Sequence, residues 1–264
     1  MTYSIITREP STGEIGVAVF TGSPFVGAKV PWAQAGVGAV ATQARTVQEY
    51  GPAGLTLLAA GVRPRTALEK LLKDDPFPEE RQLGILDRYG SVAAHTGSKA
   101  IREAGHLELD DFCVQANTMA TPTVWEASAV EYERAEGSFP ERLLAAMEAV
   151  EARGGDLRGA RSCAMRIVSA EAFSESVDVV ILDIRVDDHP APLQEMRRLV
   201  TKYMAYEAAN AAIAKAESGD IEGAFDDYAS AIQLQPEELQ LRIWGWLPLT
   251  LADEYGQLDR VAGL

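Results

Sequence analysis

Thr2, which follows the initiator methionine, has the clearest chemical potential in this sequence. Methionine aminopeptidase removes a first methionine when the second residue is small, so we expect a chain that begins at Thr2. The hydroxyl of an N-terminal threonine lies beside its own α-amine, whose reference pKa is about 7.7–8.0. That amine can take the hydroxyl proton near neutral pH, so one residue supplies both nucleophile and base. The alternative is an ordinary second residue, since many proteins begin Met-Thr.

Three amide side chains in or after apolar strand-like segments form a second group of candidates. Gln43 follows one such segment, while Gln115 and Asn117 are two residues apart and therefore share one face of another strand. Amide N–H groups at strand ends can stabilise an oxyanion or hold a substrate amide. We predict oxyanion donation by Asn117 and Gln43 and substrate binding by Gln115. The alternative for all three is the capping of neighbouring loops.

Four further residues are candidates for substrate binding. His95 and Thr96 end a predicted strand, and an imidazole there can exchange protons or donate to a substrate. Asp156 and Arg158 follow a glycine pair that permits positive φ, which brings their side chains close together. Arg158 can then clamp a substrate carboxylate in a bidentate manner. The alternatives are a structural histidine at His95 and a salt bridge that only fixes the turn.

The sequence predicts no cofactor and no metal. Its three histidines are scattered at positions 95, 106 and 189, whereas a zinc or iron site needs three or four converging ligands. Asp188 and His189 precede Pro190 and are expected to cap the following helix. The glycines near position 36 lack the lysine of a phosphate-binding loop, and no G-x-S-x-G motif occurs.

The elements that must position these residues come in pairs. Expected strands span residues 2–7, 15–21, 37–42, 82–87, 91–95, 112–117, 162–169 and 177–186, and expected helices span 55–72 (broken at Gly61–Pro64), 121–134 and 140–153. Paired strands alternating with paired helices favour an α/β (α+β) fold with two stacked antiparallel sheets and helices on both outer faces. A single sheet with helices on one face is the competing layout.

The last part of the chain carries no strand signal. We expect one domain over residues 1–192 and a helical tail over residues 193–264. The tail's spacing resembles the second half of a tetratricopeptide repeat at Gly219, Ala224, Tyr228, Ala231 and Pro236. A partial second repeat, with Trp244 and Trp246, is expected between residues 239 and 256. One repeat cannot bury its own face, so we expect the tail to pack on the first domain, on a second copy in a homo-oligomer, or on a protein partner.

Composition narrows the range of partners. The 264 residues carry a formal net charge of -15 and are 47% apolar, with a sequence pI near 4.7. Such an acidic surface repels phosphate backbones and anionic membranes, so we expect neither a nucleic acid nor a membrane partner. No window approaches about 18 uninterrupted apolar residues, and the N-terminus lacks the basic and apolar regions of a signal peptide. We therefore expect a cytoplasmic protein.

A set of short motifs occurs in a specific order along the chain: Thr2–Ile6 (TYSII), Gly16–Val19 (GVAV), Val30–Ala33 (VPWA), Ala41–Ala44 (ATQA), His95–Gly97 (HTG), Gln115–Asn117 (QAN), Gly154–Gly159 (GGDLRG) and Arg185–His189 (RVDDH). From Thr2 to about Pro192 the chain resembles the bacterial family called domain of unknown function 1028 (DUF1028). The resemblance implies a four-layer αββα sandwich of the N-terminal-nucleophile (Ntn) hydrolase type and a hydrolytic activity, with the family's threonine matching Thr2. The chain departs from the family at Arg161, where relatives tend to have glutamine, and at Ala116, where glycine is usual. Both departures bear on substrate preference more than on fold.

Two hypotheses follow for the function. In the first, processed Thr2 attacks the carbonyl of a small amide or peptide-like substrate, and water later releases the acyl group without a cofactor. In the second, the first domain is catalytically silent and the helical tail recruits a partner. A free Thr2 separates the two, because an inert scaffold has no need of one.

We predict that the purified protein begins at Thr2. Intact mass and N-terminal sequencing check this directly, because loss of Met1 lowers the mass by one methionine residue. A chain that still begins at Met1 keeps its α-nitrogen in a peptide bond and would contradict the catalytic hypothesis, favouring the scaffold.

Overall fold

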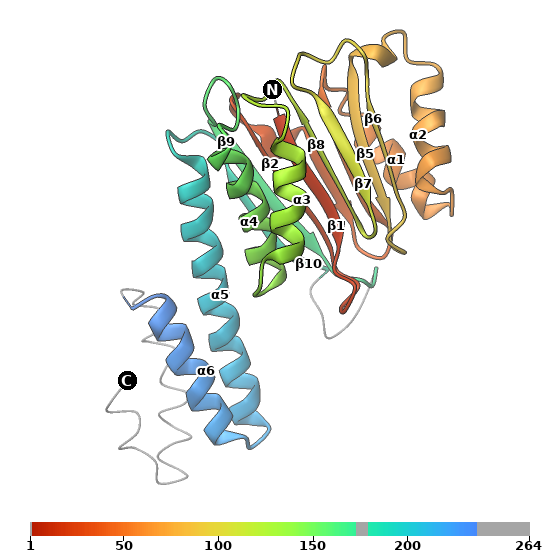
Figure 1. The fold of residues 1–264 in the computed structure, drawn as a ribbon. Helices are drawn as coiled ribbons and strands as arrows, with labels where there is room; N and C mark the ends of the chain where they lie inside the picture. Colours follow the sequence, from red (N-terminus) through yellow and green to blue (C-terminus); the bar gives the residue numbers. More distant parts are fainter. Residues whose placement is uncertain (1, 173–178, 237–264) are drawn as a thin grey trace. The chain divides into compact units, whose positions relative to one another are not determined.

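The structure, a computed structural model, describes residues 2–172 and 179–236. Within these residues it is a mixed α/β fold with two antiparallel sheets and six α-helices, which confirms the predicted fold at this level (Figure 1). The strands are β1 (Thr2–Arg8), β2 (Ile15–Thr21), β3 (Pro31–Gln34), β4 (Gly38–Ala44), β5 (Arg81–Asp87), β6 (Val92–Thr96), β7 (Gly105–Leu109), β8 (Phe112–Asn117), β9 (Ser162–Val168) and β10 (Val180–Val186). The helices are α1 (Tyr50–Ala59), α2 (Pro64–Lys73), α3 (Val124–Arg134), α4 (Phe139–Ala152), α5 (Pro192–Glu217) and α6 (Ile221–Leu234).

Every strand pairing within the two sheets is antiparallel. The larger sheet has the order β10-β9-β2-β1-β8-β7, and the smaller has the order β3-β4-β5-β6. Strand β1 is central in the larger sheet: Tyr3 pairs with Phe20 of β2, and Thr2 pairs with Asn117 of β8. The first residues of β1 and the last residues of β2 and β8 therefore meet at one end of the sheet, which we call the Thr2 end.

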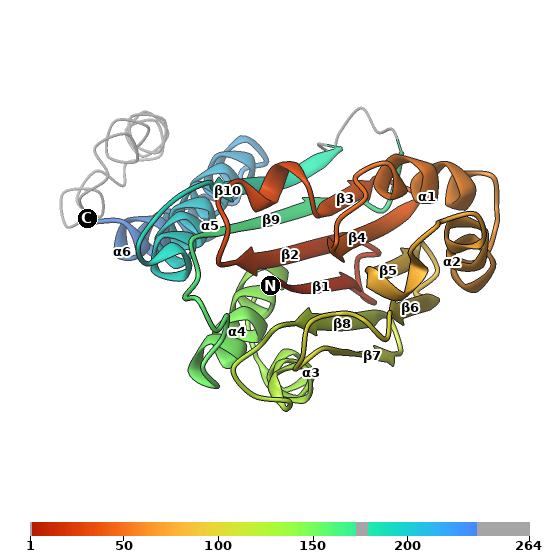
Figure 2. The same cartoon turned by 90° about the horizontal axis from the view of Figure 1, so that it is seen from above.

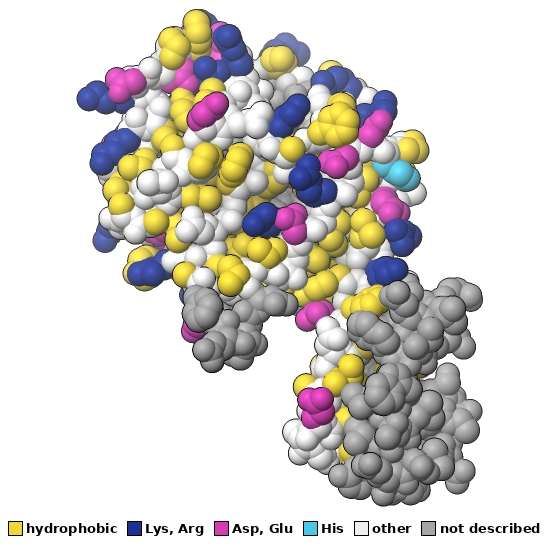
Figure 3. Space-filling model, turned by 180° about the vertical axis from the view of Figure 1, so that it is seen from behind, with side chains coloured by type: hydrophobic (Ala, Val, Ile, Leu, Met, Phe, Trp, Pro, Cys, Tyr) yellow, Lys and Arg dark blue, Asp and Glu magenta, His cyan; other side chains and the backbone are white. Residues whose placement is uncertain are grey.

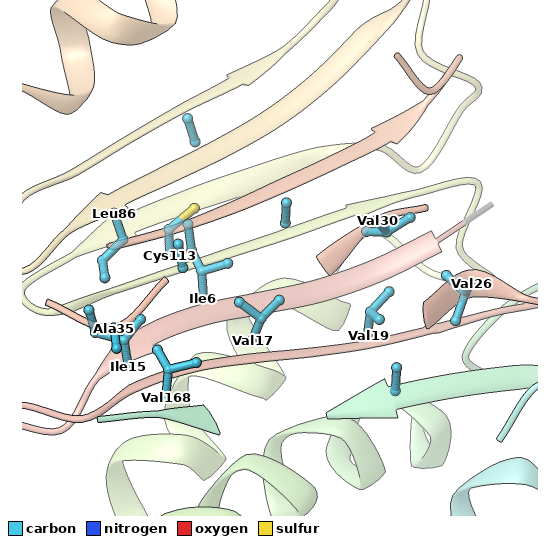
Figure 4. Packing of buried hydrophobic residues seen from close by; sticks show 14 residues of the cluster. Ile6, Ile15, Val17, Val19, Val26, Val30, Ala35, Leu86, Cys113 and Val168 are labelled. Carbon is cyan, nitrogen blue, oxygen red and sulfur yellow. The ribbon is translucent and has the colours of Figure 1, made fainter. Parts of the chain in front are cut away.

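The two sheets face each other across a shared apolar core. Ile6, Val17 and Val19 of the larger sheet belong to one buried cluster with Ala41 and Leu86 of the smaller sheet (Figure 4). Small residues on the smaller sheet let the sheets approach closely, and burial of this cluster supplies much of the driving force for stacking. The competing single-sheet layout is therefore wrong.

Helices cover both outer faces of the stacked sheets (Figure 2). Helices α3 and α4 lie on the larger sheet, where the Tyr3 hydroxyl lies 2.6 Å from Ser128 Oγ of α3. Helices α1 and α2 lie on the smaller sheet, where Val40 packs with Leu55 and Leu68. Because side chains alternate along a strand, Val40 meets the helices while its neighbour Ala41 meets the other sheet. This explains why the apolar segment around Val40 is buried on both faces, as expected.

Two edge strands, β3 and β7, were not predicted. Strand β3 falls outside the predicted strands, and it begins with Pro31 at the edge of its sheet, where the missing N–H of proline costs no ladder bond. Strand β7 (sequence GHLEL) is half-exposed and lacks an apolar run. Edge strands need less apolar sequence than central ones, so pattern alone missed both.

A buried ion pair fixes the start of β5. The Asp75 carboxylate accepts from Arg81 Nε at 2.7 Å and Nη2 at 3.0 Å, and it also accepts from the Tyr50 hydroxyl. The Asp75 and Arg81 side chains are 2% and 8% exposed. Hydrogen bonds from Arg81 hold the pKa of Asp75 well below its ordinary value. Arg81 Nη1 also donates to the Arg45 carbonyl at 2.9 Å, so the pair fixes the segment after β4.

The chain divides into two compact units, residues 1–196 and 197–264, with helix α5 continuing across the boundary. In the second unit, Gly219 has a φ of 89° and Asp220 caps α6 by accepting from the Gly223 N–H. Ala224 and Tyr228 of α6 are buried, at the positions where the repeat spacing places them. The boundary after residue 192 and the tetratricopeptide resemblance stay predictions. The second repeat predicted around Trp244 and Trp246 lies outside the described residues.

Neither basic nor acidic side chains dominate the face shown in Figure 3. Despite the net charge of -15, basic and acidic side chains are interspersed there with apolar ones. Among the helices of the described ranges, none has the length and apolar character needed to cross a membrane.

We predict that Asp75→Asn destabilises the protein by about 3 kcal/mol, because it removes one partner of a buried ion pair and leaves Arg81 unmatched. Since the pKa of Asp75 is lowered in the folded state, the stabilisation is complete above about pH 5 and is lost as pH falls through the folded-state pKa. Urea denaturation at neutral and acidic pH checks this: the gap between wild type and variant narrows in acid. Glu79→Gln, which breaks the exposed pair with Lys99, is the control and leaves the midpoint unchanged. Equal midpoints for Asp75→Asn and wild type at neutral pH would contradict the account.

Candidate functional site

Thr2 is the first residue of β1 and lies almost completely buried at the Thr2 end of the sheets. Alternation along the strand places its side chain on the same face as Ser4 and Ile6, which point toward the smaller sheet. Thr2 Oγ1 lies 3.2 Å from the hydroxyl of Thr21, the last residue of β2. The Thr2 carbonyl accepts from Gln43 Nε2 at 3.1 Å and from Asn117 Nδ2 at 3.4 Å. The structure thus brings Thr2, Gln43 and Asn117 together.

Four fully buried carboxamides join the two sheets beside Thr2: Gln43, Gln82, Gln115 and Asn117, here called the amide cluster. Gln82 Oε1 accepts from Gln43 Nε2 at 2.8 Å and from Asn117 Nδ2 at 2.9 Å. Gln43 Oε1 accepts from Ser4 Oγ at 2.8 Å, and Gln115 Nε2 donates to the same hydroxyl at 3.2 Å. Gln82 is not among the residues predicted from the sequence. It stands at the start of a predicted apolar strand, and nothing in the neighbouring residues indicates that its side chain points toward the other sheet.

The cluster bridges the sheets through backbone as well as side-chain bonds. Gln115 Nε2 of the larger sheet donates to the Ala41 carbonyl of the smaller sheet at 2.9 Å. Gly84 makes room for this crossing, because a Cβ there would lie only 3.4 Å from the Gln115 carboxamide and 3.3 Å from Ile6 Cδ1. A buried amide is costly unless it is hydrogen-bonded, so the bonding pattern fixes both the spacing and the orientation of these side chains.

The bonds of Gln43 and Asn117 define what these two amides do in this structure. The Asn117 carboxamide has two hydrogens, which are directed at the Thr2 carbonyl and at Gln82 Oε1. Gln43 Nε2 contacts the same two acceptors. Both amides therefore hold the main chain of Thr2, and oxyanion donation by either one requires one of these bonds to break.

His95 and Thr96 are adjacent on β6 and point in opposite directions. Thr96 Oγ1 faces inward and lies 2.9 Å from Gln82 Nε2, which joins it to the amide cluster. His95 faces away, and its Nε2 lies 2.8 Å from the Pro78 carbonyl. A second histidine, His106 of β7, lies with its Nδ1 2.8 Å from Thr96 Oγ1. From the sequence, His106 is a candidate only as a metal ligand, because no strand is predicted at β7.

Asp156 and Arg158 lie close together, and they fix the turn that precedes β9. Asp156 is 3% exposed, and its carboxylate accepts from the Gly22 N–H at 2.5 Å and from the Arg158 N–H at 2.8 Å. The Arg158 guanidinium lies 3.3 Å from the same carboxylate, with about half of its side chain exposed. Because Gly22 directly follows Thr21, Asp156 holds the end of β2 beside Thr2.

A cavity of about 440 Å³ opens at the Thr2 end. Asn117, which pairs with Thr2, forms part of its lining, together with Ala44, Arg45, Glu80, Lys99, Ala100 and Ile101. Two ion pairs of 2.7 Å stand at its rim, Arg45–Glu80 and Lys99–Glu79. A cavity of similar size near Gly36 and Arg88 lies at the opposite ends of β4 and β5, far from these groups. We therefore take the cavity at Asn117 as the candidate substrate site.

Unusual backbone conformations gather at the same end of the sheets. Among the described residues, five other than glycine have positive φ, and four of them lie in or near strand ends at the Thr2 end: Phe25, Ala44, Glu103 and Thr118. Such conformations cost about 1 kcal/mol or more each and are enriched at functional sites. Their clustering is independent of the hydrogen-bond argument and points to the same end of the molecule.

The described residues contain no group of three or more His, Cys, Asp or Glu side chains arranged to hold a metal ion. Burial lowers the pKa of His106, so this half-buried imidazole is neutral near pH 7. The hydroxyl of Thr21 and the amides of Gln43 and Asn117, which contact Thr2, are uncharged.

Comparison with known proteins gives the following relationships. The model of a family of unknown function (DUF1028) matches residues 2–196. A crystal structure of a protein from Silicibacter pomeroyi, described with the same family, is 29% identical with a TM-score of 0.70, and the match covers 76% of this chain and 88% of that one. Anbu (ancestral β-subunit) from Yersinia bercovieri is 11% identical with a TM-score of 0.37, over 74% of this chain and 91% of that one. No curated protein matches the chain.

The family match spans most of the chain and begins at Thr2. The Silicibacter pomeroyi protein has a fold similar to that of this chain. The chain belongs to the DUF1028 family.

Proposed function

We propose that this protein is an N-terminal-nucleophile amidohydrolase that uses Thr2, after removal of Met1, to cleave an amide bond in a small amide or peptide-like substrate. The observation that carries the proposal is the hydrogen bonding around Thr2. Two buried amides hold its carbonyl, and its hydroxyl contacts that of Thr21. A strand terminus with no catalytic task has no need of three buried polar partners from three other strands.

The αββα class of Ntn hydrolase folds is part of the same proposal. Two facing antiparallel sheets with a helix pair on each outer face support it. Thr2 opens β1, a central strand of the larger sheet, and its side chain lies on the same face as Ser4, which contacts the smaller sheet.

The proposed chemistry needs only the atoms of processed Thr2, the substrate and water. The free α-amine accepts the proton of Thr2 Oγ1 while the oxygen attacks the substrate carbonyl, giving a tetrahedral intermediate. The intermediate collapses as the C–N bond breaks, and the departing nitrogen takes the proton from the α-ammonium. An ester on Thr2 remains, and water, activated by the same amine, hydrolyses it to a carboxylic acid and restores Thr2.

The surrounding residues have positioning roles in this proposal. Gln43 and Asn117 fix the main chain of Thr2 through its carbonyl. Because the hydroxyl is only a few bonds from that carbonyl, its orientation is restricted as well. Asp156 fixes the turn at Gly22 and thereby Thr21. A free α-amine has a reference pKa of about 7.7–8.0, so a useful fraction of it is unprotonated at neutral pH.

Substrate binding is assigned to the cavity of about 440 Å³ beside Asn117. Its volume suits a small molecule, and its rim carries both charge signs, already paired with each other. Thr96 and Gln115 act through the amide cluster, while Arg158 holds the turn with Asp156 and donates from Nη1 to Ser23 Oγ at 3.4 Å. His95, which faces Pro78, is left without a role in this arrangement.

We predict that Thr2→Ala lowers the hydrolysis of a panel of acyl and aminoacyl arylamides at least about 1,000-fold, because the nucleophile is lost. Thr2→Ser retains measurable activity, because a primary hydroxyl beside an α-amine can perform the same steps. The wild-type rate rises with pH through the pKa of the amine. The measurement is release of the arylamine, with the N-terminus of each variant verified by mass.

Thr12→Ala is the matched control, since Thr12 is an exposed hydroxyl in the β1–β2 turn at the far end of the same strand. It is expected to hydrolyse the panel at the wild-type rate. Turnover by Thr2→Ala at the wild-type rate would contradict the proposal. Lack of turnover by wild-type protein with a free Thr2 would instead favour a catalytically silent domain that acts through its tail.

A further inference from the structure

A second depression lies beside the first, on the other side of the loop between β6 and β7. It has a volume of about 660 Å³ and shares Ala100 with the cavity at Asn117. Strand β7 and helix α3, which lie side by side in Figure 2, supply part of its wall. The polar, charged and aromatic side chains that line it are Thr96, Ser98, Arg102, Glu103, His106 and Trp125.

The imidazole of His106 is linked to the amide cluster through Thr96. Gln82 Oε1 accepts from the other amides, and Gln82 Nε2 faces three acceptors: Thr96 Oγ1 at 2.9 Å, the Gly105 carbonyl at 3.0 Å and the Ala116 carbonyl at 2.8 Å. Thr96 Oγ1 lies 2.8 Å from His106 Nδ1, and the hydroxyl hydrogen is assigned to this contact. Burial lowers the pKa of His106 and keeps the ring neutral. With the Thr96 hydrogen directed at Nδ1, the neutral ring carries its proton on Nε2, and its free edge is a hydrogen-bond donor.

The depression also carries one cation and one anion that are not paired. Arg102 and Glu103 both line it, and within the described ranges neither side chain makes an ion pair or a hydrogen bond. The nearby Lys99 differs from Arg102 in this respect, because it forms an ion pair with Glu79. Glu103 also has a φ of 49°, a costly conformation for a residue with a side chain.

An aromatic wall completes the depression. The indole of Trp125 packs on the backbone of Gly105 so closely that a Cβ at that position would lie 2.8 Å from Trp125 Cζ2. Pro122 and Ala104 add apolar surface next to it. The depression thus combines an apolar wall, a free guanidinium, a free carboxylate and an imidazole N–H donor.

We propose that this depression is a binding site for a zwitterionic α-amino acid with an apolar side chain. Arg102 and the N–H of His106 bind the carboxylate, Glu103 binds the ammonium group, and Trp125 packs against the side chain. Charge complementarity selects this ligand class: a simple carboxylate leaves Glu103 unmatched, and a simple amine leaves Arg102 unmatched. The site requires no chemistry at Thr2.

The test compares three ligands that differ by one charged group: L-phenylalanine, 3-phenylpropanoate and phenethylamine. Isothermal titration calorimetry of the full chain is expected to give a Kd for L-phenylalanine below about 1 mM, with each analogue at least about tenfold weaker. In parallel, ¹H–¹⁵N NMR of the imidazole is expected to show His106 protonated on Nε2 and to shift on binding.

Arg102→Gln and Glu103→Gln are each expected to weaken L-phenylalanine at least about tenfold. Both residues lie on the surface of a loop, and thermal denaturation verifies that each variant is folded. Arg134→Gln, which removes a cation from the C-terminal end of α3, is the control and leaves the Kd unchanged. Equal binding of the three ligands, or unchanged binding by Arg102→Gln and Glu103→Gln, would overturn the proposal.

Discussion

The need to satisfy four buried carboxamides constrains the whole first unit. Gln43, Gln82, Gln115 and Asn117 lie between two sheets whose facing residues are otherwise mostly apolar, so their partners are on the opposite sheet or beside them, and Gln115 Oε1 alone of their polar atoms is buried without a partner within the described residues. Only one register of each strand aligns these groups, because a slip of one residue turns every side chain to the other face. The apolar core brings the sheets together, and the amide cluster determines how they align.

This constraint is what gives Thr2 a defined position. A strand terminus is ordinarily one of the looser parts of a fold, yet the Thr2 carbonyl is held by two amides that are themselves held by Gln82. The same cluster extends in the other direction through Thr96 to His106. The two proposed sites therefore share one hydrogen-bonded support, and a change at Gln82 is expected to affect both.

The first hairpin, the hairpin of β5 and β6, and helices α3 and α4 could be predicted because each carries its own local pattern. Helix α4, for example, begins with a capping box between Ser138 and Glu141. Spacing also placed Gln115 and Asn117 on one face, since alternation in a strand is a local property. Gln82 and His106 were missed because their importance comes from which strand lies opposite, and that is set by the stacking of the sheets. The half-exposed edge strands β3 and β7 had no apolar pattern to reveal them.

The most direct test of the account is to ask whether Thr2 is a reactive nucleophile. Purified protein is treated with a threonine-directed acylating probe such as a β-lactone, and the site of modification is located by peptide mass spectrometry. The account predicts one adduct, on an N-terminal peptide that begins with Thr2, with the other buried threonine at the site, Thr21, unmodified. Failure to modify a chain that begins with Thr2, or modification equally spread over other hydroxyl groups, would contradict it.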